Sequence, residues 1–174
     1  MTLRLRAVAT ILAVLICVSC NQSPAPPEAT APPENALQGV WRMESIESTD
    51  EAGNATAFQA QPGQLIFTDS HYSMVYVPDE SPRVPSAKHW EPTDAERLAH
   101  YQSIKVNSGT YEMSGSRITV RPIIARAPEF VGGHETLEFG LDGDLLTLRT
   151  VELVSGGGVA NTGAADTMKL RRVE

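Results

Sequence analysis

The sequence predicts an all-β domain, an eight-stranded antiparallel up-and-down barrel with one short helix. Two observations carry this prediction: short runs of β-branched and apolar residues recur along the chain, and turn-forming residues separate them. Strands are expected at residues 39–48, 64–69, 71–77, 109–114, 116–125, 134–141, 144–153 and 166–173. Eight antiparallel strands can remove their edges by closing into a barrel, whose interior just holds one small ligand. A sandwich of the same strands is the alternative.

Short turn motifs are expected to join several of these strands: Asp69-Ser70, Ser114-Gly115-Ser116 and Asp142-Gly143-Asp144. Asp-Gly between two alternating strands is a strong hairpin signal. In the strand at 116–125, Ile118, Val120 and Pro122 fall on one face. Because Pro122 has no amide donor, it marks an edge strand or a bulge.

One segment, residues 89–106, has helical character. Thr93 and Glu96 have the spacing of a capping box, which satisfies free amides at the start of a helix. Leu98, Tyr101 and Ile104 then recur at helical spacing. We expect this amphipathic helix to lie against an apolar surface, at the open end or the flank of the barrel.

The N-terminal segment resembles an export signal. Arg4 and Arg6 precede an apolar run at residues 7–18, which is shorter than the ~20 apolar residues that span a bilayer. We therefore expect residues 1–19 to be a cleaved signal peptide. An uncleaved membrane anchor is the alternative.

The end of this segment, Cys17-Val18-Ser19-Cys20, resembles a bacterial lipobox, although Cys17 stands where leucine is usual. The resemblance implies that Cys20 carries lipid and becomes the mature N-terminus. Asn21 after it resembles lipoproteins that are sent to the outer membrane. Several acyl chains make a firm anchor, because each buried CH₂ contributes ~0.8 kcal/mol.

Residues 20–35 are expected to be the lipidated cysteine and a proline-rich tether. The segment 21–35 contains five prolines, two glutamates and no large apolar residue. Such a segment cannot bury enough surface to offset the entropy lost on ordering. Residues 36–174 remain for the barrel, which is enough chain for one domain with its own core.

The charge and the cysteine content exclude several classes of function. The formal net charge is −7, and it becomes −9 when Arg4 and Arg6 leave with the signal peptide. An acidic surface argues against nucleic acid as a partner and against docking on anionic lipid, so the lipid anchor is the expected membrane contact. With Cys17 removed and Cys20 acylated, no thiol remains for a disulfide or a metal site.

No motif of the sequence points to a catalytic centre. The four histidines are His71, His89, His100 and His134, and no two have the spacing of a local metal motif. There is no G-x-S-x-G elbow or phosphate-binding loop, and the one C-x-x-C, Cys17 to Cys20, lies in the lipobox-like end of the export segment. We therefore assign no catalytic residue, no metal and no cofactor.

The motif Gly39-Val40-Trp41 at the start of the first strand resembles the G-x-W of the lipocalins. The resemblance implies that this tryptophan closes the bottom of the barrel and that an arginine of the last strand packs over it. Arg172, in the C-terminal "MKLRRVE", is similar to that arginine. A guanidinium plane over an indole contributes ~0.5–2 kcal/mol, and the indole N–H still needs an acceptor.

More of the chain resembles the bacterial lipocalin-like domain family. The similar stretches are "GQLIFTDSHYSMVYV", "YQSIKVNSGTYEMSGSRITVRP" and "GDLLTLRT". Together they cover nearly all of residues 37–173 and imply a calycin-type barrel. The family commonly has a histidine in its fifth strand, and Arg121 occupies that place here.

The candidate ligand-binding residues are Arg121, Arg149, Glu112, Glu138, Tyr76, Tyr111 and Trp90. The four charged residues lie within predicted strands and would form a polar cluster if they face inward. The alternative is that they form the solvated outer face. The tyrosines suit a pocket wall or ordinary core packing, and the tryptophan suits a cover over the open mouth or local packing.

These features lead to one preferred function and two alternatives. The protein is expected to be a monomeric lipoprotein of the bacterial cell envelope, anchored in the outer membrane and facing the periplasm. It would bind a small apolar or amphipathic molecule non-covalently in the barrel cavity. The first alternative is a structural module with a filled barrel that binds another envelope protein. The second is a small-molecule lyase or isomerase that uses arginine and glutamate inside the barrel.

Overall fold

A computed structural model describes residues 35–50, 52–161 and 165–174. The expected signal peptide, Cys20 and nearly all of the expected tether lie outside these residues. The elements are β1 (Gly39–Thr49), β2 (Ala55–Gln59), β3 (Gly63–Phe67), β4 (His71–Tyr76), α1 (Asp94–Gln102), β5 (Lys105–Ser114), β6 (Arg117–Ala125), a 3₁₀ turn η1 (Pro128–Phe130), β7 (His134–Asp142), β8 (Leu145–Val154) and β9 (Ala165–Arg172). None of the helices in this part of the chain is long and apolar enough to cross a membrane.

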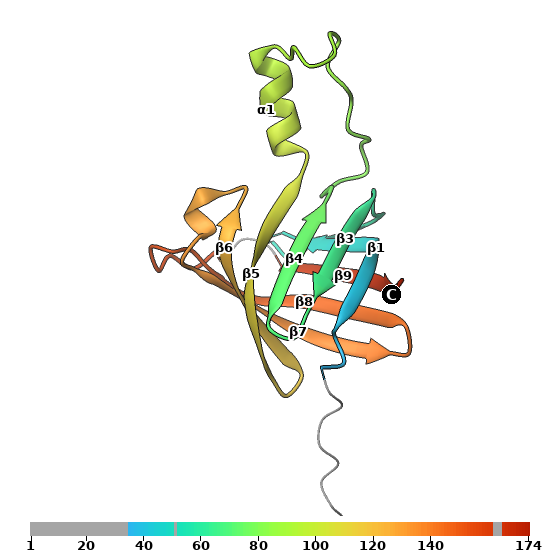
Figure 1. Cartoon of the computed structure of the whole chain (residues 1–174), viewed down its shortest axis with the longest axis vertical. Helices are drawn as coiled ribbons and strands as arrows, with labels where there is room; N and C mark the ends of the chain where they lie inside the picture. Colours follow the sequence, from blue (N-terminus) through green and yellow to red (C-terminus); the bar gives the residue numbers. More distant parts are fainter. Residues whose placement is uncertain (1–34, 51, 162–164) are drawn as a thin grey trace, which may run out of the picture. The chain divides into compact units, whose positions relative to one another are not determined.

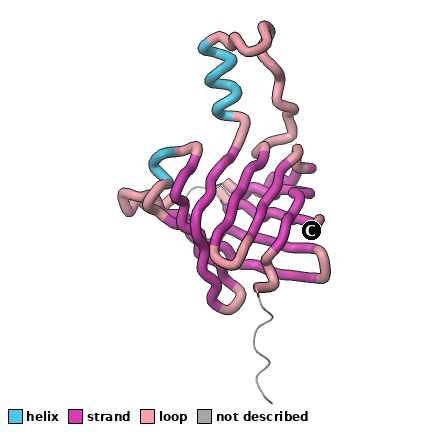
Figure 2. Tube along the Cα trace, viewed as in Figure 1, coloured by secondary structure: helices cyan, strands magenta, loops and turns pink. Residues whose placement is uncertain are grey.

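The strands form a closed antiparallel barrel, which confirms the predicted fold class. Each strand from β3 to β9 pairs with the next, and β9 returns to pair with β1. β2 and β3 share one side of β1: β2 pairs with Ser45–Thr49, and β3 pairs with Gly39–Arg42. They therefore act as one interrupted strand, so the barrel has eight strand positions. Strands β3 to β5 cross in front of β7 to β9 (Figures 1 and 2).

The strand boundaries agree with the prediction to within two residues, with two exceptions. β5 starts four residues earlier than expected, at Lys105. β2 was not expected, because its sequence ATAFQ is short, rich in alanine and almost wholly exposed, so it shows no apolar alternation. The expected bulge is present: the register between β5 and β6 shifts where Gly109 pairs with Pro122.

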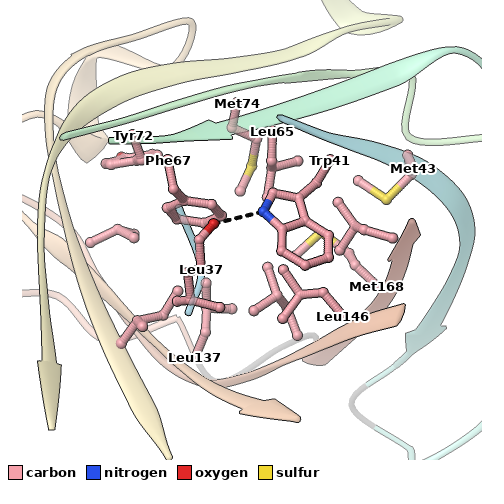
Figure 3. Packing of buried hydrophobic residues seen from close by; sticks show 14 of the residues in the cluster. Leu37, Trp41, Met43, Leu65, Phe67, Tyr72, Met74, Leu137, Leu146 and Met168 are labelled. Atoms are coloured by element: carbon pink, nitrogen blue, oxygen red, sulfur yellow. Dashed lines mark hydrogen bonds between the residues drawn. The ribbon is translucent and has the colours of Figure 1, made fainter. Parts of the chain in front are cut away.

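One end of the barrel is filled by apolar side chains. Trp41 is fully buried there among residues from β3, β7, β8 and β9, and Figure 3 shows this packing. Its indole N–H donates a hydrogen bond to the Leu37 carbonyl at 2.7 Å. The Arg172 guanidinium lies 4.1 Å from the ring centroid and donates to the carbonyls of Ala36 and Gln38. The stacking expected from the sequence is therefore present, and it closes this end.

The helix has the predicted start, but its expected packing is wrong. Thr93 and Glu96 form both hydrogen bonds of a capping box at the start of α1. However, no residue of α1 is buried, and Figure 1 shows the helix extending beyond the strands. Its contacts with the barrel are local: the Tyr101 hydroxyl donates to the Arg126 carbonyl, and the Arg126 guanidinium stacks on the Tyr101 ring. The apolar stripe is too short to cover the barrel mouth. Its Tyr101 instead holds the C-terminal end of α1 against Arg126.

Candidate functional site

The end of the barrel opposite Trp41 contains a cavity of about 570 Å³. Its wall comes from the ends of β4 to β9 and from the loops at 125–130 and 155–161. The apolar packing of the closed end stops below it, at Met74 and Met168, which form part of the lining. The interior is thus filled in one half and open in the other.

The pairing between β6 and β7 is incomplete, and the cavity lies beside the unpaired part. These strands pair only from Arg117–Val120 to Glu135–Glu138. Beyond Val120, β6 continues to Ala125 while the chain detours through η1 before β7 begins. Because the sheet is unpaired there, the side chains of Phe130 and Glu129 line the cavity in place of a continuous strand.

A row of two acids and two hydroxyls occupies four successive strand positions, and three of its members, the two acids and Thr150, line the cavity. The Thr150 hydroxyl on β8 donates to Glu135 on β7 at 2.9 Å. The Ser48 hydroxyl on β1 donates to Asp166 on β9, and the two residues are register partners. Arg149 on β8 pairs with Thr167 on β9. Because the strands are antiparallel, Thr150 and Asp166, the next residue on each strand, lie opposite each other. We call these four residues, Glu135, Thr150, Asp166 and Ser48, the acidic row.

Burial raises the pKa of the Glu135 carboxyl to about 7; the Thr150 hydrogen bond and the charge of Lys105 oppose this increase, and the charge of Asp166 adds to it. Burial also raises the pKa of the Tyr76 phenol, and the charges of Asp166 and Glu135 raise it further. Both acids line the cavity, and their charges act on each other and on the tyrosine. Near neutral pH Glu135 is poised between its neutral and ionised forms.

Polar groups near the row remain without a protein partner. The Asn107 side-chain carbonyl and the Tyr72 hydroxyl are buried and accept or donate no hydrogen bond within the described residues. Asn107 lines the cavity. Buried polar atoms are rarely left unsatisfied, so the Asn107 side-chain carbonyl can accept a hydrogen bond from a bound molecule.

The structure brings one of the seven predicted ligand-binding residues to the cavity, namely Tyr76. Tyr111 is buried at the closed end, where its hydroxyl donates to the Thr68 carbonyl at 2.6 Å. Trp90 does not cover the mouth: it is 97% exposed and does not line the cavity.

The four charged candidates lie on the outer face, so they do not form the inward cluster that was considered. Glu112 and Arg121 are exposed, and Arg149 forms an ion pair with Glu138. The reason is strand alternation: each is next to a buried residue, such as Tyr111 before Glu112 or Val120 before Arg121. The alternative considered from the sequence, a solvated outer face, is the one that the structure shows.

Sequence reasoning missed the acidic row, although the signal was present. Glu135 has the same strand parity as buried Leu137, and Thr150 has that of Leu148. Asp166 likewise shares a face with Met168. A polar residue in phase with core residues is an inward candidate, whereas the charged residues chosen from the sequence were out of phase.

Replacing Glu135 by glutamine tests the buried carboxyl. Because its pKa rises from 4.5 to about 7 on folding, the folded state binds more protons than the unfolded state between these values. The wild-type protein therefore loses stability as pH rises through this window. The unfolding free energy of Glu135→Gln minus that of wild type should increase by about 2–3 kcal/mol from pH 4.5 to 7.5, at about 1.4 kcal/mol per pKa unit.

Urea titrations at each pH measure this difference, and Glu138→Gln is the matched control. The Arg149 hydrogen bond lowers the pKa of Glu138 below its ordinary 4.5, so its linkage to folding lies at lower pH and the control difference should stay nearly flat from pH 4.5 to 7.5. A flat difference for Glu135→Gln would show that its carboxyl is not held in a desolvated site.

No three His, Cys, Asp or Glu side chains are grouped to hold a metal ion in the part of the chain that the structure describes. The cavity thus offers hydrogen bonds, carboxyl groups and apolar contacts to a ligand.

The fold and its cavity define a small β-barrel that is filled at one end and open at the other. The chain belongs to the lipocalin-like domain family, whose family model matches residues 38–167. Among solved structures, a lipocalin-like protein from Bacteroides uniformis is similar, with 12% identity and a TM-score of 0.41 over 78% of this chain and 97% of that one. No curated protein matches the chain.

Proposed function

We propose that the protein binds a small amphipathic molecule non-covalently in the open half of the barrel. The observation that carries this proposal is the cavity of about 570 Å³ with apolar walls and the acidic row on one side. Its volume falls within the ~300–1,000 Å³ that small-molecule pockets occupy. The apolar body of the ligand would be buried, and the row would fix its polar head.

The position of the cavity supports this function over a purely structural role. Packing fills the closed end with Trp41 and the apolar side chains around it, and this gives the barrel a stable core. The open end has no such filling, although Met74, Leu153 and Met168 supply apolar surface. Burying a ligand there removes apolar surface from water, which stabilises a complex by ~25 cal/mol per Å² before the costs of association.

The expected location is a separate part of the proposal. The lipobox-like end of the apolar segment supports lipidation of Cys20, an envelope location and a membrane contact through the lipid, with the barrel presented on the tether as a monomer. Metabolic labelling with a palmitate analogue should mark the protein, and Cys20→Ala should abolish the label. Equal labelling of both proteins would contradict this assignment.

A pair of neighbouring tryptophan substitutions tests whether the cavity is the binding site. Ala125 lines the cavity at the end of β6, whereas the preceding residue, Ile124, is 67% exposed on the outside. Ala125→Trp should reduce the affinity for a fluorescent fatty-amine or fatty-acid probe by about tenfold or more, because the indole occupies the ligand's volume. Ile124→Trp should leave the affinity unchanged.

Fluorescence titration measures both affinities, and thermal melts establish that both variants fold. Equal affinities for the two variants would place the probe outside the barrel. An absence of binding in the wild-type protein across such probes would reject the binding function itself.

A further inference from the structure

We propose that the ligand of this cavity carries a cationic head, a primary or secondary ammonium group, which binds at the acidic row between Glu135 and Asp166. This inference rests on the proposed function and specifies its ligand class. It is carried by the arrangement of the charged groups around the cavity.

Two acids lie close together on the cavity wall. Glu135 on β7 and Asp166 on β9 lie on either side of Thr150 on β8, and all three residues line the cavity. Each acid already accepts a hydrogen bond from a hydroxyl, Thr150 for Glu135 and Ser48 for Asp166. A hydroxyl orients a carboxylate but does not neutralise it, so the wall retains its negative charge when both acids are ionised.

Among the described residues, no protein cation forms an ion pair with either acid. The ion pairs there join other groups, such as Arg149 with Glu138 and Arg171 with Glu44 on the outer face. A carboxylate withdrawn from water is stabilised by a nearby opposite charge. An ammonium group of the ligand supplies that charge.

The two basic residues at the cavity do not fill this role. The Arg126 guanidinium forms no ion pair with either acid: it stacks on the Tyr101 ring and donates to the Tyr101 carbonyl at 2.7 Å. Lys105 is exposed and attracts Glu135 only from a distance, without an ion pair. Glu129 adds a third acid to the cavity lining. The field at the row therefore favours a cation over an anion.

The rest of the wall suits a cationic amphiphile. Tyr76 and Phe130 present aromatic rings to the cavity, and aromatic faces attract ammonium groups. Met74 and Met168 offer flexible apolar surface for a hydrocarbon chain. A carboxylate head would instead meet two acids of its own charge.

Three ligands with the same chain and different heads test the inference: dodecylamine, dodecanol and dodecanoic acid, each titrated into the purified protein by isothermal calorimetry at pH 8. Dodecylamine should bind about tenfold or more tightly than dodecanol, since a charge-assisted hydrogen bond is about twice as strong as a neutral one. Dodecanoic acid should bind more weakly than dodecanol. Glu135→Gln should remove most of the preference for the amine, while Glu138→Gln on the outer face should retain it.

The pH dependence of binding provides a second readout. The groups that face Glu135 are Asp166, Lys105, Tyr72 and Tyr76, and burial raises the pKa of both phenols, so neither tyrosine ionises near neutral pH. The affinity for dodecylamine should therefore rise between pH 6 and pH 8.5 as Glu135 ionises, and that for dodecanoic acid should fall.

The outcomes separate this inference from the proposed function. If the alcohol or the acid binds as well as the amine, or if Glu135→Gln retains the preference, the cationic head is wrong and the binding cavity stands. If none of the three ligands binds, both proposals fail.

Discussion

Trp41→Ala is expected to lower the free energy of unfolding by about 3–5 kcal/mol, the usual cost of removing a large buried aromatic side chain. Trp41 is fully buried at the closed end, and its indole donates to Leu37 and stacks under Arg172. The substitution leaves a cavity where the barrel is closed. Because a domain is stable by only about 5–15 kcal/mol, this loss is a large fraction of the total.

The second tryptophan provides the control, since Trp90 is 97% exposed. Trp90→Ala should change the unfolding free energy by no more than about 0.5 kcal/mol. Chemical denaturation followed by far-ultraviolet circular dichroism measures both changes without relying on tryptophan emission. Similar values for the two variants would mean that the closed end does not depend on Trp41.

Gly109→Ala is expected to have the next largest effect, about 2–3 kcal/mol or more of destabilisation. A β-carbon at Gly109 would lie 2.0 Å from the Arg121 carbonyl oxygen and 2.8 Å from the Pro122 α-carbon. Both contacts are with the backbone of β6, at the bulge where the register shifts. The two strands would have to separate locally, so hydrogen bonds of the ladder would be lost as well.

Gly140→Ala is the matched control on β7. A β-carbon there meets no atom within 4 Å, and alanine reduces the backbone entropy of the unfolded chain. The control should be neutral or slightly stabilising, as measured by the same denaturation experiment. A Gly109→Ala protein as stable as wild type would show that β5 and β6 do not approach each other this closely.

Much of the fold could be predicted from the sequence because its signals are local. Strand alternation, the Asp-Gly turn at 142–143 and the capping box of α1 each depend on neighbouring residues, and the structure contains all three. The tryptophan at the closed end was also predictable, through the resemblance of Gly39-Val40-Trp41 to a known motif. β2 was missed because ATAFQ is short and has a single apolar side chain facing the core, Phe58, so it shows no alternation.

The site was harder to predict, because it depends on which way each strand faces. Arg121 and Glu112 were chosen for their charge, but a charged residue in a strand is inward only if it is in phase with the core. Glu135 is in phase with Leu137 and faces the cavity. The partner strand of each acid, and the gap between β6 and β7, follow from long-range pairing that no local pattern encodes.

The position of α1 could not be predicted from local sequence patterns either. Its apolar spacing indicates a helix, but spacing does not reveal what the apolar side contacts. In the structure, Leu98 is 56% exposed and Tyr101, near the C-terminal end of α1, contacts Arg126. The helix therefore lies outside the cavity wall, and the mouth is lined by the loop around η1 and by residues 155–161 after β8.

Native mass spectrometry of residues 35–174, produced in a bacterial periplasm and purified without detergent, tests the central claim most directly. The strand pairings and the core of the described residues all lie within this range. We expect a co-purifying small molecule of drug-like size, on the order of a few hundred daltons, which is lost in Ala125→Trp and retained in Ile124→Trp. A clean apo mass for all three proteins, with no binding of amines, alcohols or fatty acids, would contradict it.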